Sequence, residues 1–452
     1  MQKDLTKGSV FRVLIQFSLP YLLSCFLQTF YGLADLFITG QFNGADAISA
    51  VSVGSQIMHM LTVIIVGLAM GSTVTISHHI GERDMKKAGR AVGNTVSLFL
   101  AFAVILTIGL LLGVEGILKC VSIPPEAYAQ TRTYLIICFA GIPFITAYNI
   151  ISCIFRGMGD SRSPLYFVAA ACVMNVVLDF LLIGCFSMGA AGAAFGTVIS
   201  QTASVVIALA AIRKKRLGLS VKKEDFRPDK KSLGNILRIG IPIAFQDGLI
   251  QVSFMIITII ANRRGVTAAA SVGIVEKIIS FFFLVPSAML SSISSITAQN
   301  VGARRYRRGA KTLQYGVTIA VSFGVLMTIL CQFLAPQILG LFTEDAMVVE
   351  MGSQYLRAYV LDCIVAGVHF CFSGYFCAYG YSGISFLQNV VSIVLLRVPG
   401  AYLASEYYPD TLYPMGLAAP AGSLLSAIIC IIVFVMWRKK FLPPQGQQEN
   451  GR

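Results

Sequence analysis

The chain has 452 residues, of which 56% are hydrophobic and 12% charged, and its mean hydropathy is +0.76. Soluble globular proteins carry about a quarter charged residues, so this composition excludes an ordinary soluble protein. The formal net charge of +14 would suit nucleic acid, but the basic residues lie beside apolar segments, where membrane topology by itself requires them. We therefore expect a membrane protein that does not bind nucleic acid.

Long apolar segments recur along the whole chain. An α-helix needs about 20 such residues to cross about 30 Å of hydrocarbon. Twelve segments meet this condition: 11–40, 47–77, 91–113, 129–155, 164–184, 189–212, 233–261, 268–298, 312–332, 352–378, 384–404 and 416–437. The sequence therefore predicts an all-α integral membrane protein with twelve transmembrane helices.

Basic residues gather on every second connection. The N-terminal segment MQKDLTKGS is polar and carries no removable signal peptide pattern. Most Lys and Arg residues fall in segments that lie on one side of the membrane: 3–12, 83–90, 156–162, 213–238, 304–311 and 438–452. This bias is the positive-inside rule, and it predicts a multi-pass protein of the cytoplasmic (inner) membrane with both termini in the cytoplasm.

The cysteines and histidines indicate neither a disulfide framework nor a metal centre. None of the eleven cysteines forms a C-x-x-C pair, and most lie within apolar segments, as small buried residues do. His78 and His79 are adjacent, so they point in different directions on a helix. They lie where a span meets a basic loop, and we expect them to anchor the helix at the interface. No cofactor is predicted.

The second half of the chain repeats the first. Ile15 to Pro20 (IQFSLP) recurs as Leu237 to Pro242 (LRIGIP), and the motif Phe155-x-x-x-Gly159-x-Ser161 recurs 221 positions later. Six is an even number, so two copies of six spans have the same orientation, as in transporters that bind substrate between two parallel halves. We expect an N-terminal lobe (1–212), a basic cytoplasmic linker (213–231), a C-terminal lobe (232–441) and a polar tail (442–452).

Two acidic residues of the first half lie inside apolar segments with no Lys or Arg at a similar depth. They are Asp35 and Asp179. A carboxylate in lipid costs about 2.5–3.5 kcal/mol on insertion scales, so each needs a partner. An acid that merely caps or pins a helix near the headgroups is the alternative for Asp35 taken alone. Uncompensated buried acids take up a proton or bind a cation, so the pair predicts a site for one of these.

Polar neighbours support one shared pocket. Asn175 lies four residues before Asp179, on the same helical face, and Thr197 and Gln201 form a polar stripe on the next span. At about 1.5 Å per residue, Asp179 lies about 22 Å from the cytoplasmic end of its span. Thr197 lies about 12 Å from the outer end of its own span, so both fall in the outer half. Asn175 and Thr197 could instead bond only to each other between helices.

The chain resembles the multidrug and toxic compound extrusion (MATE) family, of bacterial type. The resemblance covers about 10–437 and rests on Gln28-Thr-Phe-Tyr-x-x-x-Asp35, Phe155-Arg-Gly-Met-Gly-Asp-Ser-Arg162, Asn175-x-x-x-Asp179 and Gly192-Ala-Ala-x-x-Thr197. It implies two six-helix bundles around a central cavity and cation-coupled export of amphipathic, often cationic compounds, with no enzymatic activity. The positions that match the family's H⁺ or Na⁺ site are Asp35, Asn175, Asp179, Thr197 and the carbonyl of Ala193. Gln28 matches a polar position that lines the same lobe. Gln201 extends the polar stripe of Thr197 in that lobe.

The second half carries its own acids and bases. Asp247, Glu276 and Asp362 are candidates for substrate or coupling roles, although Lys277, Arg357 and Arg397 offer ion pairs to them. Some family branches use a glutamate in the seventh span, where this chain has Ile250-Gln251, so that site is not carried over. Met and aromatic side chains suit a cavity for varied guests, and Tyr31, Met58, Phe281 and Met289 are candidates.

The sequence thus predicts a multidrug antiporter that exchanges organic cations or amphipathic drugs for H⁺ or Na⁺ by alternating access between two lobes. We expect it to act as a monomer among membrane lipids. A flippase for lipid-linked sugars is the first alternative, but it would need basic residues deep in the first half. A membrane-embedded lipid-modifying enzyme is the second, although Asn175-x-x-x-Asp179 lies too deep to resemble its acidic motif. The sequence does not distinguish H⁺ from Na⁺.

Overall fold

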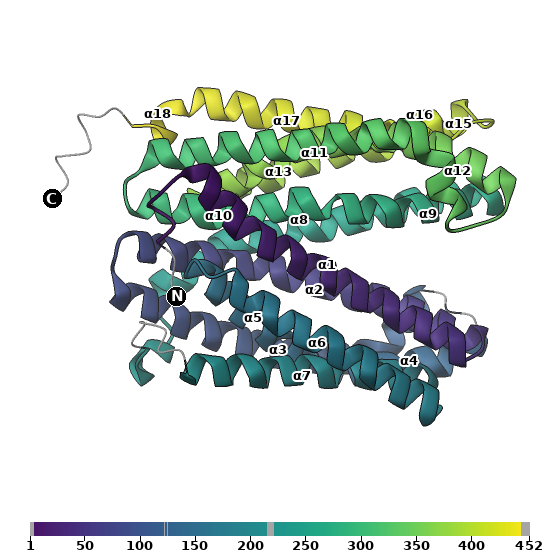
Figure 1. The fold of residues 1–452 in the computed structure, drawn as a ribbon, viewed down its shortest axis with the longest axis horizontal. Helices are drawn as coiled ribbons and strands as arrows, with labels where there is room; N and C mark the ends of the chain where they lie inside the picture. The colour runs from purple at the N-terminus through teal and green to yellow at the C-terminus, as the bar shows by residue number, and fades with distance from the viewer. Residues whose placement is uncertain (1–3, 122, 124, 215–220, 444–452) are drawn as a thin grey trace. The chain divides into compact units, whose positions relative to one another are not determined.

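The computed structural model describes residues 4–121, 123, 125–214 and 221–443, and within these ranges the chain is helical almost throughout and has no β-strand. Figure 1 shows long helices joined by short connections. The contacts divide the chain into two compact units. Unit 1 contains Leu19–Leu237, and unit 2 contains Asp4–Ser18 together with the chain from Arg238 onward.

Unit 1 holds most of the first helices. Its elements are α1 (Val10–Phe42, from Leu19), α2 (Ala45–Gly81), α3 (Met85–Val121), α4 (Pro125–Ala140), α5 (Ile142–Gly157), α6 (Arg162–Asp179), the π-helix η1 (Phe180–Cys185), α7 (Gly189–Lys214), the 3₁₀ turn η2 (Lys223–Phe226) and the start of α8 (Lys230–Arg263).

Unit 2 holds α1 up to Ser18, α8 from Arg238 and all the later elements. These later elements are α9 (Val266–Phe282), α10 (Leu284–Gly302), α11 (Tyr306–Gly340), α12 (Ala346–Tyr359), α13 (Asp362–Ala378), α14 (Ser382–Ser392), the π-helix η3 (Ile393–Arg397), α15 (Val398–Tyr407), α16 (Tyr413–Gly416), α17 (Ala418–Met436) and α18 (Arg438–Phe441).

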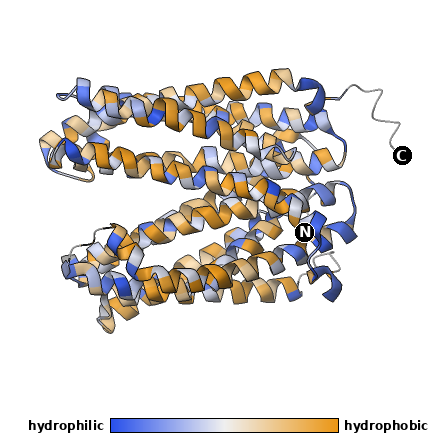
Figure 2. Ribbon diagram, turned by 180° about the vertical axis from the view of Figure 1, so that it is seen from behind, coloured by the Kyte–Doolittle hydropathy of each residue, from blue (hydrophilic) through white to orange (hydrophobic). Residues whose placement is uncertain are grey.

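Eleven described helices or helix runs are long and apolar enough to cross a membrane. A twelfth span results if α4 and α5, which meet at a 49° bend, are counted as one. The bend falls at Gly141, just before Pro143, whose missing N–H and ring prevent a continuous helix. The predicted twelve-helix fold is confirmed. Figure 2 shows its physical basis, since the helices are hydrophobic along most of their length and hydrophilic near their ends.

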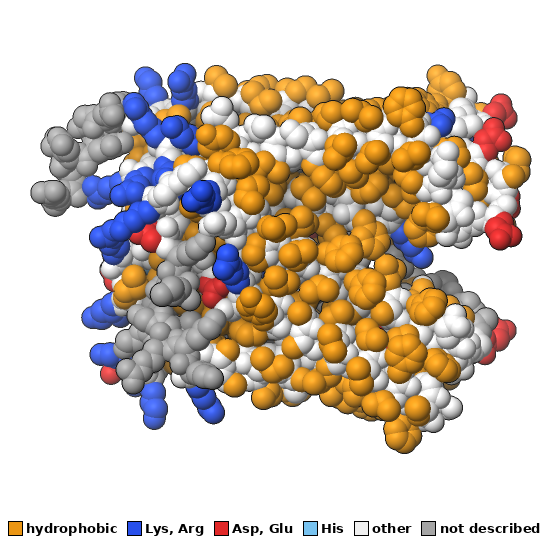
Figure 3. Space-filling view, viewed as in Figure 1, with side chains coloured by type: hydrophobic (Ala, Val, Ile, Leu, Met, Phe, Trp, Pro, Cys, Tyr) orange, Lys and Arg blue, Asp and Glu red, His pale blue; other side chains and the backbone are white. Residues whose placement is uncertain are grey.

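Charged side chains lie at the helix ends. In Figure 3, Lys and Arg side chains gather at one end of the helices of each unit, and acidic side chains are prominent at the opposite end. Figure 3 thus agrees with the alternation of basic connections that the sequence shows. Arg156, which we counted with the connections, lies instead in α5, is only 7% exposed and places its guanidinium 4.7 Å from the ring of Tyr21.

The division into units differs from the expected lobes at the N-terminus and at the linker. Residues 4–18, expected in the N-terminal lobe, belong to unit 2, where Leu14 and Phe17 pack in a hydrophobic cluster with Ile293. The described part of the predicted linker packs against α3. The Asn94 amide donates to the backbone oxygen of Asp225 at 3.0 Å and accepts from the backbone N–H of Asp229 at 2.7 Å. Positions 215–220 of the linker and 444–452 of the tail lie outside the described residues.

Candidate functional site

The Asp35 carboxyl lies inside unit 1 on α1. Its residue is 3% exposed, and the hydroxyl of Thr197 on α7 donates to its Oδ2 at 3.1 Å. The hydroxyl of Thr39, one turn further along α1, donates to the backbone oxygen of Asp35 at 2.7 Å. Two helices that are far apart in sequence therefore meet at this carboxyl.

Asp179 ends α6 and faces the same place. It is fully buried, and Asn175 lies one turn before it on the same face. A Cβ atom built on Gly196 of α7 would lie 2.3 Å from Asp179 Oδ1 and 3.7 Å from Asn175 Nδ2. The absence of a side chain at Gly196 thus lets the acid approach the α7 backbone. Asp179 and Asn175 both lie within interaction range of the Asp35 carboxyl.

Most polar atoms of this cluster have no hydrogen-bond partner by strict geometry. These are Asp35 Oδ1, both Asp179 carboxylate oxygens and both amide atoms of Asn175. No Lys, Arg or His side chain lies within 4.0 Å of either acid in the described part of the chain. Unpaired buried polar groups cost about 1–3 kcal/mol each, and unpaired charges cost more. The arrangement can hold a proton between the two carboxyls, or a hard cation bound by their oxygens.

A π-helix begins directly after the cluster. The six residues of η1 (Phe180–Cys185) continue α6 beyond Asp179 with the wider helical turn. Single π turns inside α-helices are rare and are frequent at functional sites. We did not predict this feature, because the apolar sequence of η1 carries no pattern that separates it from an ordinary α-helical turn.

The other predicted first-half residues lie around the cluster at different distances. The Gln201 amide donates to the hydroxyl of Tyr31 at 3.1 Å, so these two residues extend the polar region along α1 and α7. Ala193 is fully buried one turn before Thr197, in α7. Gln28 is half-buried on α1, and the structure gives it no hydrogen bond among the described residues.

The acids of the second half are not ion-paired as we expected. No base lies within 4.0 Å of Asp247, Glu276 or Asp362 in the described residues. Glu276 accepts from the hydroxyl of Thr258 at 3.2 Å, and Arg397 donates to the hydroxyl of Tyr359 at 2.8 Å. Arg397 nevertheless acts electrostatically on Asp362 and Glu276, so for these two acids the expected compensation by a second-half base is present beyond 4.0 Å and not as a contact ion pair.

Two cavity candidates are core residues instead. Met58 packs in a hydrophobic cluster of unit 1 and Met289 in one of unit 2. Sequence reasoning chose these residues for their flexible side chains, but it could not show which helix face they occupy. Tyr31 is partly buried beside Gln201, as described above.

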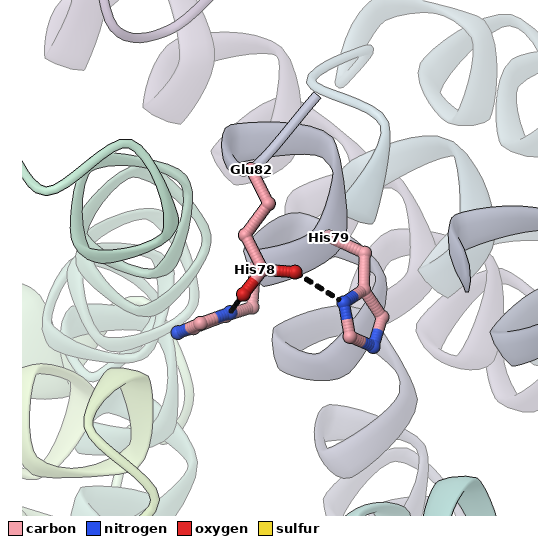
Figure 4. Close-up of side chains that lie close together, drawn as sticks. All are labelled: His78, His79 and Glu82. Atoms are coloured by element: carbon pink, nitrogen blue, oxygen red, sulfur yellow. Dashed lines mark hydrogen bonds and ion pairs between the residues drawn. The ribbon is translucent and has the colours of Figure 1, made fainter. Parts of the chain in front are cut away.

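The two adjacent histidines share one partner at the end of α2 (Figure 4). His79 Nδ1 lies 2.9 Å from Glu82 Oε2 and His78 Nδ1 lies 3.4 Å from Oε1. In Figure 4 the two rings extend to opposite sides of the carboxylate, so they point in different directions, as expected, and still share one partner. Their ligand atoms lie within 4.8 Å of one another, which is compatible with a metal ion, although half-exposed ion pairs also have this geometry. Burial opposes ionisation, but the hydrogen bond from His79 and the neighbouring positive charges hold the pKa of Glu82 below its ordinary 4.5.

A polar surface pocket lies where α1 ends and α7 begins. It is lined by Asn43, Asp46, Gln130 and neighbouring residues, and Asn43 Oδ1 and Gln130 Oε1 are buried there without a partner. Asn43 lies eight residues after Asp35, or about 12 Å along the helix direction. The pocket therefore lies on the same side of unit 1 as the end of α1 that follows Asp35, and the acids themselves do not line it.

The chain is similar to known membrane proteins over most of its length. The profile of the MatE family matches residues 20–181 and 242–403. The chain is 30% identical over 413 residues to the probable multidrug resistance protein YpnP of Bacillus subtilis (strain 168), covering 89% of this chain and 90% of that protein. It is 25% identical over 403 residues to the multidrug export protein MepA of Staphylococcus aureus (strain NCTC 8325 / PS 47), covering 87% and 88%.

A solved structure agrees with the fold. It is the outward-facing conformation of a multidrug resistance MATE family transporter of the MOP superfamily, which superposes with a TM-score of 0.91 over 97% of this chain and 98% of that chain. The two sequences are 22% identical. The similarity therefore supports the architecture and not the identity of any ligand.

Proposed function

The chain belongs to the MatE family of multidrug and toxic compound extrusion transporters, and from this premise we propose that it is a cation-coupled multidrug antiporter. In this proposal it exports amphipathic or cationic organic compounds and takes up H⁺ or Na⁺ in exchange. The coupling cation binds to Asp35 and Asp179, with Asn175, Thr197 and the Ala193 carbonyl as further ligands. The chain acts as a monomer, in the cytoplasmic membrane, with both termini in the cytoplasm.

One observation carries the proposal. Two carboxyls are buried within interaction range of each other, three of their four oxygens have no partner, and no fixed cation lies at contact distance in the described part of unit 1. Two ionised carboxylates cannot stay this close in a medium of low dielectric constant without a compensating charge. A mobile cation therefore has to visit the cluster.

The same geometry gives a route from ion binding to conformational change. A bound cation draws together α1, α6 and α7, whereas the ion-free acids repel each other. The end of α6 continues into the π-helix η1, whose extra residue can shift between turns. An ion that binds one arrangement more tightly shifts the population toward it, and coupling free energies of about 1–3 kcal/mol are typical. Alternating access between the two lobes follows if substrate favours the opposite arrangement.

The test is efflux of a fluorescent organic cation from everted membrane vesicles, with a proton gradient and a sodium gradient imposed separately. Asp35→Asn and Asp179→Asn each remove one charge at nearly constant volume. We expect either variant to lose gradient-driven efflux while its amount and folding in the membrane stay unchanged. Glu126→Gln, at an exposed acid in the first turn of α4, is the control and should transport normally. Normal efflux in both aspartate variants would place the coupling site elsewhere.

The flippase alternative rests on one observation. Arg156 is buried in unit 1, and its Nε has no partner, so a basic group does lie inside the first half, as a pyrophosphate would need. Translocation of a lipid-linked sugar in proteoliposomes, lost in Arg156→Gln, would support this alternative. Efflux of organic cations with no translocation of the lipid would exclude it.

A further inference from the structure

Unit 2 contains a counterpart of the acid cluster of unit 1. The family match repeats in residues 20–181 and 242–403, and in each unit a helix that ends in a π-helix lies near the end of the match, α6–η1 with Asn175 and Asp179 and α14–η3 with Arg397. The last long helix of each unit carries a glycine followed by a hydroxyl residue, Gly196-Thr197 in α7 and Gly422-Ser423 in α17. Both pairs lie in about the first third of their helix.

The two glycines play the same role in packing. A Cβ atom on Gly422 would lie 2.8 Å from Ser392 Oγ and 3.2 Å from Arg397 Cβ, so this glycine faces the α14–η3 segment. Gly196 faces Asn175 and Asp179 of α6 in the same manner. The structure therefore supports the correspondence independently of the family match.

A buried carboxyl lies beside this pair in unit 2, although it comes from α13 and not from the repeat of α1 or α6. Asp362 at the start of α13 is fully buried, and neither of its oxygens has a partner by strict hydrogen-bond geometry. The Ser423 hydroxyl lies within its interaction range, as the Thr197 hydroxyl does for Asp35. The difference between the units is the cation. No base lies within 4.0 Å of the acids in either unit among the described residues, but in unit 2 Arg397 lies near enough to act electrostatically on both Asp362 and Glu276, whereas no base acts so on Asp35 or Asp179.

Arg397 is held firmly in place. It is 7% exposed and ends the π-helix η3, its Nη2 donates to the Tyr359 hydroxyl at 2.8 Å, and its guanidinium carbon lies 4.6 Å from the ring centroid of Phe254. Its Nε has no partner. Because a guanidinium does not lose its proton in proteins, this positive charge is permanent.

We propose that the guanidinium of Arg397 is a resident cation that takes, in unit 2, the place of the mobile cation of unit 1. Unit 2 then needs no ion from solution and does not load or release one during the cycle. This inference rests on the proposed function, because only a coupled transporter loads and releases an ion in each cycle. It predicts that removal of the Arg397 guanidinium turns unit 2 into a site for a mobile cation.

The test uses the full-length chain with Asp35→Asn and Asp179→Asn, so that unit 1 cannot bind the ion. Thermal unfolding is measured in NaCl and in choline chloride at equal ionic strength, and in separate samples across pH. In this double variant, which is the parent of the further variants, we expect no sodium-dependent change in Tm. Adding Arg397→Gln should create one, of about 1–2 °C at ten times the dissociation constant for a chain of this length, or an equivalent rise in Tm as the pH falls.

In the samples measured across pH, the change in Tm depends on every titratable group that faces the site. These are Asp362 and His369 of α13, Glu276 of α9, and Tyr355 and Tyr359 of α12. Adding Asp362→Asn to the Arg397→Gln chain should remove the new sodium or proton dependence, because the carboxyl that binds the ion is gone. Arg397→Lys, which keeps the charge, should behave as the parent.

Two outcomes would overturn the proposal. One is an Arg397→Gln chain that unfolds at the same temperature in sodium and choline and at every pH. The other is an Arg397→Gln chain that folds in no condition unless Asp362→Asn is added, since a mobile cation would then be unable to replace the guanidinium. Failure of the proposed antiport has a different signature, namely efflux by the unmodified chain that does not respond to either gradient.

Discussion

Gly196→Ala is expected to weaken cation binding while the protein still folds. Intrinsic helix propensity favours Ala over Gly by about 1 kcal/mol, so the change should by itself stabilise α7. The added Cβ, however, would lie 2.3 Å from Asp179 Oδ1, and real Cβ contacts are essentially never below 3.0 Å. The carboxyl must therefore move by about 1 Å to reach an ordinary contact distance.

The size of the effect follows from this displacement. A hard cation lies about 2.4 Å from its carboxylate oxygens. Moving one oxygen from there to about 3.5 Å costs about 2 kcal/mol of attraction at an effective dielectric constant of about 20. The apparent affinity for the coupling cation should fall about thirtyfold.

The assay is efflux from everted vesicles at a series of cation concentrations, together with the Tm of the purified protein. Gly32→Ala is the matched control, because it lies on α1 one turn before Asp35 and a Cβ there meets nothing within 4 Å. We expect Gly32→Ala to keep the unmodified affinity. A Gly196→Ala protein with unchanged cation affinity would refute the argument that Asp179 must lie against α7.

Thr197→Val should lower the apparent cation affinity of efflux about tenfold, because it removes the 3.1 Å hydrogen bond to Asp35 and keeps the side-chain volume; an unchanged cation titration would contradict this. Asp46→Asn should weaken the apparent cation affinity about two- to fourfold by removing the negative charge of the surface pocket, whereas Glu126→Gln should not; equal effects would indicate a general surface charge. The pKa of Glu82 is lowered, so its stabilising effect on the end of α2 should be present above pH 4.5 and lost as the pH falls through the folded-state pKa. Hydrogen exchange of this helix end should show that loss, and Glu82→Gln should abolish the pH dependence.

The sequence was sufficient for the membrane architecture because the requirement is local. Each apolar segment has to satisfy its own backbone hydrogen bonds in lipid, so length and hydropathy identify the helices whatever their packing. The same reasoning selected Asp35 and Asp179, since a charge in hydrocarbon is costly in any fold. Helical periodicity placed Asn175 beside Asp179, and the structure brings both to the Asp35–Thr197 pair. Their role in coupling stays a prediction.

Tertiary structure decided the features that depend on which helix faces meet. Nothing in the residue pattern marks η1 and η3 as π-helices, or shows that Gly196 and Gly422 face an acid and an arginine. The pattern also suggested ion pairs for the second-half acids, whereas Arg397 makes its direct contacts with Tyr359 and Phe254 and acts on Asp362 and Glu276 only beyond 4.0 Å. The physical reason is that hydropathy sets the depth of a residue along its own helix, while the rotation of that helix about its axis is fixed only by packing against helices distant in sequence.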